Sequence, residues 1–314
     1  MTRRRKGDKV DGWLVLDKPA GTSSAAAVTA VRRLFNAAKA GHGGTLDPLA
    51  TGVLPIAFGA ATKTVPYVMD GTKLYRFIVR WGERRTTDDA EGAVVAASDA
   101  RPTAAAIAAM LPRFTGDIDQ VPPDFSAIKV EGRRAYARAR QGEALVLAPR
   151  RVRIDRLSLL SVPDSDHAEL ETMCGKGTYI RSLARDLAEA LGTVGYVATL
   201  RRVAVGPFRE ADAISLENLT SLGHSPARFT YLRPVETALD DIPALAVTEA
   251  DSLRLRRGQV VQIRRAAHEH CGAHELGSDQ VVLATASGLP VALARIELEA
   301  AGLARLRPLR VLNL

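Results

Sequence analysis

Strand-like and helix-like segments follow one another along this chain without the regular strand–helix repeat of a parallel α/β fold. A short apolar strand is predicted at 13–16, ended by Pro19, and an alternating strand is predicted to start at Lys73. Apolar residues at helical spacing occur in 21–35 after Ser or Thr caps, and again after the cap Thr103. This irregular mixture predicts an α+β fold around a mixed or antiparallel central sheet with flanking helices.

The segment 167–192 carries the clearest pair of elements. HAELETMC at 167–174 alternates like a strand, and the turn GKG leads into a helix predicted over 178–192. Thr178 is positioned to cap this helix and Gly192 to end it. One face of the helix is apolar and is expected to face the core; it consists of Ile180, Leu183, Ala184, Leu187 and Leu191.

The stretch 41–52, GHGGTLDPLATG, places four glycines around a single carboxylate, that of Asp47. Glycine permits positive φ and the close approach of a ligand, and Pro48 favours an extended conformation of Asp47. We therefore predict a shaped loop whose backbone can come close to a ligand. On spacing alone, the simplest interpretation of Asp47 is that it closes an Asx-type turn.

The chain carries a formal net charge of +8, which favours an anionic partner such as nucleic acid, a phosphate ligand or an acidic membrane surface. Segment 129–156 holds most of this excess, with nine Lys or Arg against three Asp or Glu. Such a run can be a solvated helix face. Its concentration favours a phosphate-binding surface, and Gly132 and Gly142 suggest a flap over about 121–156 that orders on binding.

The composition of the other segments indicates how the chain is divided into domains and in which compartment it works. Residues 1–10 are predicted to be a basic disordered tail, without the apolar segment of a secretory signal, and no apolar run is long enough for a membrane span. The distant cysteines Cys174 and Cys271 fit a reducing cytoplasm better than a disulfide framework. Residues 215–242 have the composition of a connector, and short apolar runs broken by Gly predict a small β-rich domain at 243–314.

One histidine-rich segment, HEHCGAH, raises the question of a metal site with His268, His270, Cys271 and His274. We expect none there, because the pattern is not HExxH and no second ligand pair lies at zinc-finger spacing. GAATKT lacks the second glycine of a P-loop, and the chain has neither a GxSxG elbow nor a dinucleotide fingerprint. No cofactor is therefore expected.

Several segments, in the same order, resemble the TruB family of tRNA pseudouridine synthases and cover most of residues 12–210. They are LDKPAGTSS, GHGGTLDPLATGVLPI, FGAATK, LYRFIVRWG, PPDFSAIKVEGRRAYARAR and CGKGTYIRSLARDLAEALG. The resemblance implies a pseudouridine synthase catalytic domain at 11–240 and a PUA-like RNA-binding domain at 243–314. It also implies isomerisation of uridine 55 in the TΨC arm of tRNA without cofactor or metal. The expected partner is the TΨC stem-loop, and we expect a monomer with no obligatory protein partner.

By the same resemblance, Asp47 is the essential acid, which either attacks C1′ of the target nucleotide or abstracts its C2′ proton; both routes stay open. Arg181 matches the family arginine that pairs with this acid, and a nearby guanidinium favours the ionised carboxylate. The first turn of a helix is a poor place for a cation because the dipole is positive there, so a carboxylate partner explains Arg181. Tyr75 matches the tyrosine that stacks on the target uracil and can accept the C5 proton.

The resemblance also implies residues that hold the RNA. Tyr179 and Leu200 match positions that line the uracil pocket, and His42 matches the histidine that helps fill the gap left by the flipped uridine. Phosphate contacts are implied for Lys18, Lys63, Lys129, Arg133, Arg134, Arg138 and Arg140.

One segment departs from the family pattern. Many members carry TDTxDxxG, whereas this chain has RTTDDAEG at 85–92, so Thr86 stands where an aspartate often occurs. Asp88 or Asp89 could substitute for it, and their roles stay open. Two rival interpretations are the catalytic subunit of a guide-RNA pseudouridylation particle and a tRNA-folding helper that acts without catalysis.

Overall fold

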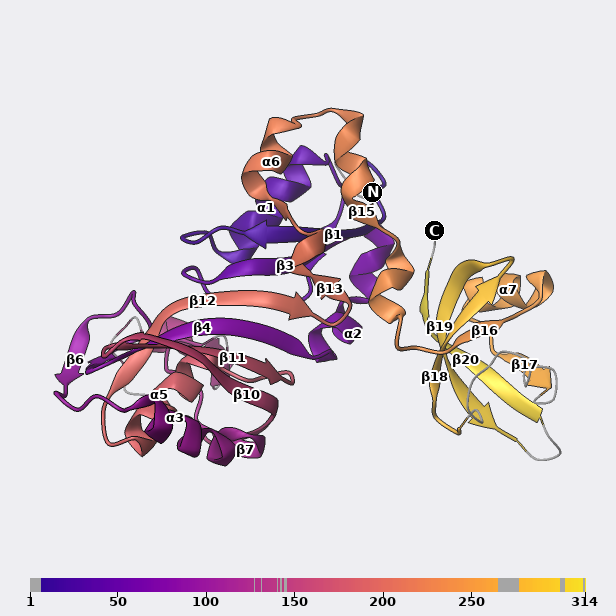
Figure 1. Cartoon of the computed structure of the whole chain (residues 1–314). Coiled ribbons are helices and arrows are strands. Elements are labelled where there is room, and N and C mark those ends of the chain that lie inside the picture. Colours follow the sequence, from indigo (N-terminus) through magenta and orange to yellow (C-terminus); the bar gives the residue numbers. More distant parts are fainter. Residues whose placement is uncertain are drawn as a thin grey trace.

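Figure 1 shows the chain, as a computed structural model, with a large domain around one sheet and a smaller domain at its C-terminal end. The structure describes residues 7–126, 128–130, 132–139, 141, 143, 146–264, 277–299, 303–312 and 314. Strands and helices mix without a βαβ repeat, so the predicted α+β class is confirmed. Among the described residues, no helix is long and apolar enough to cross a membrane.

The large domain is built on a mixed sheet to which the described residues contribute eleven strands. Its main path runs through β14 (Ile214–Ser215), β1 (Gly12–Lys18), β3 (Thr51–Phe58), β12 (Gly195–Val205), β4 (Lys73–Trp81), β11 (His167–Cys174), β10 (Arg150–Asp164) and β7 (Gly116–Gln120). Three short strands, β13 (Phe208–Arg209), β15 (Leu232–Arg233) and β2 (Ala40–His42), pair with β12, β1 and β3. Strands β3 and β12 are parallel, as are β1 and β14, and the other pairs are antiparallel.

Both faces of strand β1 are buried, which explains its unbroken apolar sequence. Leu14 and Leu16 belong to the larger core cluster, whereas Trp13 and Val15 belong to the cluster on the other side. Alternate residues of a strand point to opposite faces, so a strand covered on both sides is apolar throughout. Each such fully buried large side chain contributes about 1.5–3 kcal/mol relative to its exposed state.

Helices on these faces supply the rest of the core. The α-helices of the large domain are α1 (Ser24–Leu34), α2 (Val65–Asp70), α3 (Ala104–Met110), α4 (Ala135–Ala139), α5 (Ile180–Ala190) and α6 (Leu216–Ser221). Shorter elements are β5 (Glu83–Arg85), β6 (Val94–Ala97), η1 (Gly59–Lys63), η2 (Leu111–Phe114), η3 (Glu210–Asp212), η4 (Pro226–Tyr231) and η5 (Val235–Leu239). The side chain of Ser23 caps α1 and that of Thr103 caps α3, as the sequence predicts.

Helix α5 confirms the predicted apolar stripe but not the predicted cap. Ile180, Leu183, Ala184 and Leu187 are buried, and Leu191 is partly buried. Thr178 does not cap the helix; its hydroxyl donates to the carbonyl of Gly175. The capping position is Tyr179, which has no capping side-chain bond. The prediction for Thr178 was therefore wrong by one residue, because the turn GKG uses its hydroxyl.

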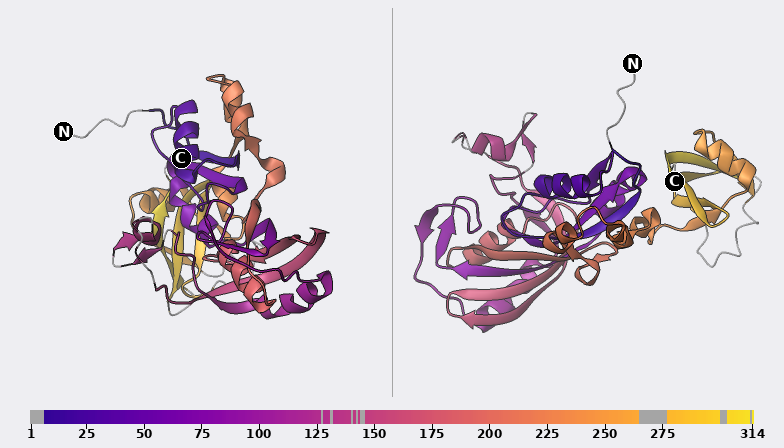
Figure 2. Two further views of the ribbon diagram at one scale, coloured as in Figure 1. Left: turned by 90° about the vertical axis from the view of Figure 1, so that its left-hand side faces the viewer. Right: turned by 90° about the horizontal axis from the view of Figure 1, so that it is seen from above.

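The basic flap extends from the large domain but ends earlier than predicted. A small hairpin, β8 (Lys129–Val130) and β9 (Arg133–Arg134), leads into α4, and Figure 2 shows this unit projecting beyond the central sheet. Residues 150–156, which the prediction included in the flap, belong to β10 and pair with β7 and β11. This segment is a strand because its burial alternates residue by residue: Val152 and Ile154 are buried, and the residues on either side of them are exposed.

The predicted connector at 215–242 is largely part of the large domain, since β14 and β15 both pair with β1. The small domain contains β16 (Ala244–Ala246), α7 (Glu249–Arg256), β17 (Val261–Arg264), β18 (Val281–Ala286), β19 (Leu289–Leu298) and β20 (Leu303–Val311). These five strands form one sheet in the order β16-β18-β19-β20-β17. Leu283, Leu293 and Leu312 of this domain pack in the same core cluster as Trp13 and Phe208 of the large domain.

Candidate active site

Asp47 lies in the loop between β2 and β3, and buried side chains hold this loop by its backbone. The Ser24 hydroxyl donates to the carbonyl of Leu46 at 2.9 Å and accepts from the Leu46 N–H at 2.8 Å. Lys18 is fully buried, and its ammonium donates to the carbonyls of Pro19, Thr22 and Pro48. The backbone on both sides of Asp47 is therefore fixed before any substrate binds.

A third clamp on the loop is Arg202 of β12, which is 1% exposed. Its guanidinium donates to the carbonyls of Val53, Thr45 and Gly44 at 2.8, 3.3 and 3.0 Å. Gly44 adopts φ +124°, and a Cβ on Gly43 would meet Val68 Cγ1 at 2.7 Å. Packing within the protein therefore favours glycine at 43 and the backbone conformation favours it at 44, in addition to any approach of RNA.

We expect the variant Ser24→Ala to lower both stability and rate. It leaves the N–H and the carbonyl of Leu46 without their buried partner, which costs about 1–3 kcal/mol. Displacement of the neighbouring Asp47 should slow a single turnover by about tenfold. Urea unfolding and rapid-quench kinetics measure the two effects. Thr103→Ala is the control, since it removes the cap of another helix, α3, and Thr103 lies outside the cavities around Asp47; an equal loss of rate there would contradict the assignment.

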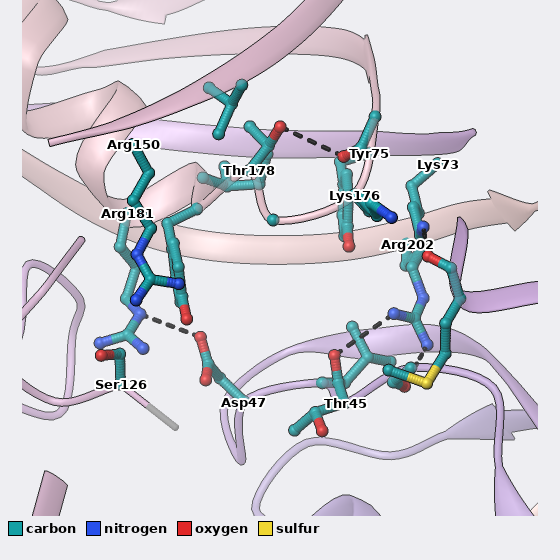
Figure 3. A pocket seen from close by; sticks show the side chains of 18 of the residues that line it. Thr45, Asp47, Lys73, Tyr75, Ser126, Arg150, Lys176, Thr178, Arg181 and Arg202 are labelled. Atoms are coloured by element: carbon teal, nitrogen blue, oxygen red, sulfur yellow. Dashed lines mark hydrogen bonds and ion pairs between the residues drawn. The ribbon is translucent and has the colours of Figure 1, made fainter. Parts of the chain in front are cut away.

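Arg181 meets Asp47 from the first turn of α5, as predicted. Its Nε donates to Asp47 Oδ2 at 2.9 Å, and its two terminal nitrogens donate to the carbonyls of Thr87 and Phe125, each at 2.9 Å. The Arg181 side chain is 4% exposed, whereas that of Asp47 is 34% exposed. The guanidinium is thus held on three sides, and the carboxylate it pairs with stays open to a ligand (Figure 3).

The structure separates the roles of the two aspartates in RTTDDAEG. Asp89 Oδ2 lies 3.6 Å from Arg181 Nε, and both side chains are 4% exposed. Asp88 has a different partner, accepting from Arg185 at 3.0 Å. Asp89 therefore provides Arg181 with a second, buried carboxylate. Sequence reasoning left this choice open because neighbouring residues of an irregular segment can point in opposite directions.

Two cavities meet at the Asp47–Arg181 pair, which lines both of them. One has a volume of about 560 Å³ and is also lined by Tyr75, Tyr179 and Leu200. The other has a volume of about 740 Å³ and is also lined by His42, Phe125 and Tyr136. The structure thus brings the predicted acid, its arginine and the predicted uracil-pocket residues to one cavity, and places His42 in the adjoining one.

Burial controls the protonation of the groups around these cavities. Burial raises the pKa of Tyr75, although the nearby Arg202 acts in the opposite direction, so its phenol is neutral at pH 7. Burial also raises the pKa of Tyr179. The pKa of His42 is lowered by burial and then by the charge of Arg202, so its imidazole is neutral at pH 7. Burial lowers the pKa of Lys18 to about 8, which still leaves it protonated.

The predicted phosphate contacts have different placements. The ammonium of Lys18 is buried among carbonyls, and Lys63 donates to the carbonyl of Val311 in the small domain. Arg133 donates to Gln141, and Arg138 to Glu143, both within the flap. Lys18 is thus a support of the loop in this structure. Arg140 and the side chains of Lys129 and Arg134 lie outside the described residues.

Sequence reasoning missed Arg150, an exposed residue that lines the Tyr75 cavity (Figure 3). Its neighbours Arg151 and Arg153 pair with Asp119 and Asp117, at 3.5 and 3.6 Å. Arg150 has no carboxylate partner within the part of the chain that the structure describes. Arg151 lines the same cavity, so what distinguishes Arg150 is the absence of a carboxylate partner, which the alternating basic pattern of β10 could not show.

No group of three His, Cys, Asp or Glu side chains that could hold a metal occurs among the described residues. The cluster His268, His270, Cys271 and His274 lies outside them. Cys174 is buried beside Lys73 on the neighbouring strand, and burial raises the pKa of its thiol to about 11. This thiol is therefore protonated and unsuited to nucleophilic chemistry at neutral pH.

Comparison with known proteins gives matches along the whole chain. The profile of the TruB family pseudouridylate synthase N-terminal domain matches residues 32–180, and that of the tRNA pseudouridylate synthase B C-terminal domain matches 181–240. The tRNA pseudouridine synthase B of Rhodospirillum rubrum is 53% identical over 314 residues, covering 100% of both chains. That of Bradyrhizobium diazoefficiens is 54% identical over 316 residues, covering 99% of this chain and 88% of the relative.

Solved structures with a similar fold are more distant in sequence. A chain in the crystal structure of a Cbf5-Nop10-Gar1 complex superposes with a TM-score of 0.71 at 24% identity, covering 92% of this chain and 79% of that chain. A chain in the crystal structure of the archaeal box H/ACA sRNP Nop10-Cbf5 complex superposes with a TM-score of 0.72 at 22% identity, covering 99% of this chain and 92% of that chain. At these identities the likeness is one of fold.

Proposed function

The chain belongs to the TruB family of pseudouridylate synthases, and on that premise we propose that it converts uridine 55 in the TΨC arm of tRNA to pseudouridine, with Asp47 as the essential acid. The observation that carries the proposal is the Asp47–Arg181 pair at the edge of the cavity with Tyr75, Tyr179 and Leu200. This cavity combines an open carboxylate with a wall that suits a planar base.

The reaction breaks the N1–C1′ bond, turns the freed uracil and joins its C5 to C1′. Asp47 either attacks C1′ to form an ester, or removes the C2′ proton to leave a glycal, and both routes need an ionised carboxylate. Arg181 donates from Nε to the Asp47 carboxylate and so holds it in position at the cavity. In the final step C5 loses its proton and N1 gains one, so the isomerisation needs neither oxidant nor cofactor.

Tyr75, Tyr179 and Leu200 hold the base during this exchange. A neutral phenol ring can stack on uracil, and the raised pKa of Tyr75 disfavours the phenolate that would accept the C5 proton. We therefore favour stacking as the role of Tyr75. The neutral imidazole of His42 lines the second cavity together with Asp47, which supports a role for His42 in stacking where the flipped uridine leaves the loop.

The experiment that tests this function is tritium release from a tRNA transcript labelled at uridine C5, without added metal. The expected result is one equivalent released per tRNA and pseudouridine at position 55 by sequencing. No release, in the presence of tight tRNA binding, would reject the proposal and favour an RNA-folding or guide-dependent role. We propose the TΨC stem-loop as the partner, a monomeric enzyme in the cytoplasm, and a PUA-like RNA-binding role for residues 243–314.

We further propose that exposed cations at the cavity rim and on the flap, rather than Lys18, bind the phosphates. Arg150 is the clearest case, since it is exposed, lines the cavity and lacks a carboxylate partner among the described residues. Charges of the flap, including Arg133 and Arg138, would join it when the flap meets RNA. Lys129, Arg134 and Arg140 stay in the proposal on sequence grounds alone.

The variant Arg150→Gln is expected to weaken tRNA binding and to reduce the salt dependence of log Kd by about one unit per decade of salt. The reason is the loss of one phosphate contact and its released counterion. Filter binding at several KCl concentrations measures both quantities. Arg153→Gln is the matched control, because Arg153 pairs with Asp117 and Asp155 and does not line the cavity. Equal slopes for wild type and Arg150→Gln would contradict the contact.

A further inference from the structure

Gln120 is a buried polar residue for which the reaction described above has no use. It ends β7, is 1% exposed, and pairs in the sheet with Arg150. Its side-chain amide makes two bonds to one residue: Oε1 accepts from the Tyr179 N–H at 2.8 Å, and Nε2 donates to the Tyr179 carbonyl at 3.1 Å. A side chain buried to this extent is costly unless both its groups are paired, and here both are.

The residue held in this way lies at a critical point of the site. Tyr179 is the capping position of α5, with an extended backbone and no capping side-chain bond. Its ring lines the cavity beside Asp47, and its carbonyl also accepts from Leu183, the first bond of the helix. Two residues later the chain reaches Arg181, which pairs with Asp47. The direction of the Tyr179 peptide therefore affects both the cavity wall and the catalytic pair.

We propose that Gln120 is a positioning residue for this reaction: its amide fixes the Tyr179 backbone and so sets the Tyr179 ring against the base and Arg181 against Asp47. This inference rests on the proposed function. An amide is the group that fits, because it is a donor and an acceptor in one plane. A carboxylate in its place would direct a lone pair at the Tyr179 carbonyl, and an aliphatic side chain would leave both backbone groups unpaired.

The hydrogen bonds of the next residue, Val121, show that contact with α5 alone does not link a residue to the cavities. Ser182 and Arg185 of α5 both donate to the carbonyl of Val121, at 2.8 Å each. These bonds also fasten the base of the flap to the helix, but neither side chain lines the two cavities. In the described structure, the bonds of Val121 lead to side chains outside the cavities. The bonds of Gln120, by contrast, hold Tyr179, which belongs to the cavity wall.

The test compares Gln120→Leu with wild type in single-turnover tritium release and in tRNA binding. We expect the rate to fall by about 10- to 100-fold with the Kd for tRNA within about twofold, because misplacement of reacting groups affects the rate more than affinity. Ser182→Ala, the matched control, should keep the wild-type rate. In a double-mutant cycle with Tyr179→Leu, the two losses should be clearly less than additive.

Gln120→Glu provides a second readout that is independent of the Leu variant and its folding. A protonated carboxyl can donate to the Tyr179 carbonyl as the amide does, whereas a carboxylate cannot. The rate of Gln120→Glu relative to wild type should therefore rise as the pH falls from 8 to 6. Circular dichroism confirms that each variant is folded.

Three outcomes would overturn the inference: a wild-type rate in Gln120→Leu, additive losses in the cycle, or a flat relative pH profile for Gln120→Glu. Failure of the proposed function is a separate result, since the wild type itself would then release no tritium.

Discussion

A tRNA transcript labelled at uridine C5 is expected to keep its tritium in the presence of Asp47→Asn, while the wild type releases one equivalent. Asparagine has the shape of aspartate but can neither attack C1′ nor take the C2′ proton. We expect the single-turnover rate to fall by a factor on the order of 10⁴ or more. The amide oxygen can still accept from Arg181 Nε, so tRNA binding and thermal stability should stay close to those of the wild type.

The control for this variant is Asp88→Asn. Asp88 is also buried and ion-paired, but its partner is Arg185 and it lines neither cavity. Its φ of +56° is one that asparagine tolerates, so the substitution is not expected to strain the backbone. We expect its rate to stay within about threefold of wild type, as for other changes that do not touch the reacting groups. Full activity of Asp47→Asn would instead support the RNA-folding helper.

The second large effect is expected for Arg181→Met, which keeps much of the side-chain volume and removes the charge. Asp47 then loses the donor that holds it at 2.9 Å, and Asp89 is left as a buried carboxylate without the cation that lies 3.6 Å away. We expect the single-turnover rate to fall by about 10²–10³-fold. The pair with Asp89 is buried on both sides, so the free energy of unfolding should fall by about 3–5 kcal/mol.

Arg185→Met separates these two effects because it lies one turn further along the same helix. Arg185 pairs with Asp88 and Asp186, so its loss should also lower stability in urea unfolding. Its rate per folded molecule should stay near that of the wild type. Equal losses of rate in the two variants would show that Arg181 acts on the reaction through the helix rather than through its bond to Asp47.

Local patterns of the chain predicted much of the fold correctly. Period two in β4 and β11, apolar spacing along α5 and caps at Ser23 and Thr103 all hold in the structure. These features depend on interactions among residues close in sequence, which a pattern can represent. Prediction from local pattern failed where a side chain had two possible partners. Thr178 is the example, because its hydroxyl donates back to the carbonyl of Gly175 instead of capping the helix.

The partners of the buried cations Lys18 and Arg202 could be predicted from the sequence even less well. A lysine such as Lys18 in a polar segment suggests a solvent contact, yet its ammonium is enclosed by three carbonyls from the turns around it. Arg202, in an ordinary strand pattern, clamps the Asp47 loop from a distance of more than 150 positions along the chain. Whether a cation faces water or a carbonyl depends on which loops the fold brings to it, and composition carries no information on this.

The motifs and their order along the chain were enough to indicate the family and the α+β class, and to single out Asp47 as the proposed acid with Arg181 as its partner. Each motif is a short run of residues that can be recognised without the fold. The second carboxylate of Asp89, the open position of Arg150 and the clamp of Gln120 on Tyr179 emerge only from the folded chain. Each is a contact between segments far apart in sequence. Such contacts form when the sheet aligns its strands and the burial of polar groups forces each one to find a partner.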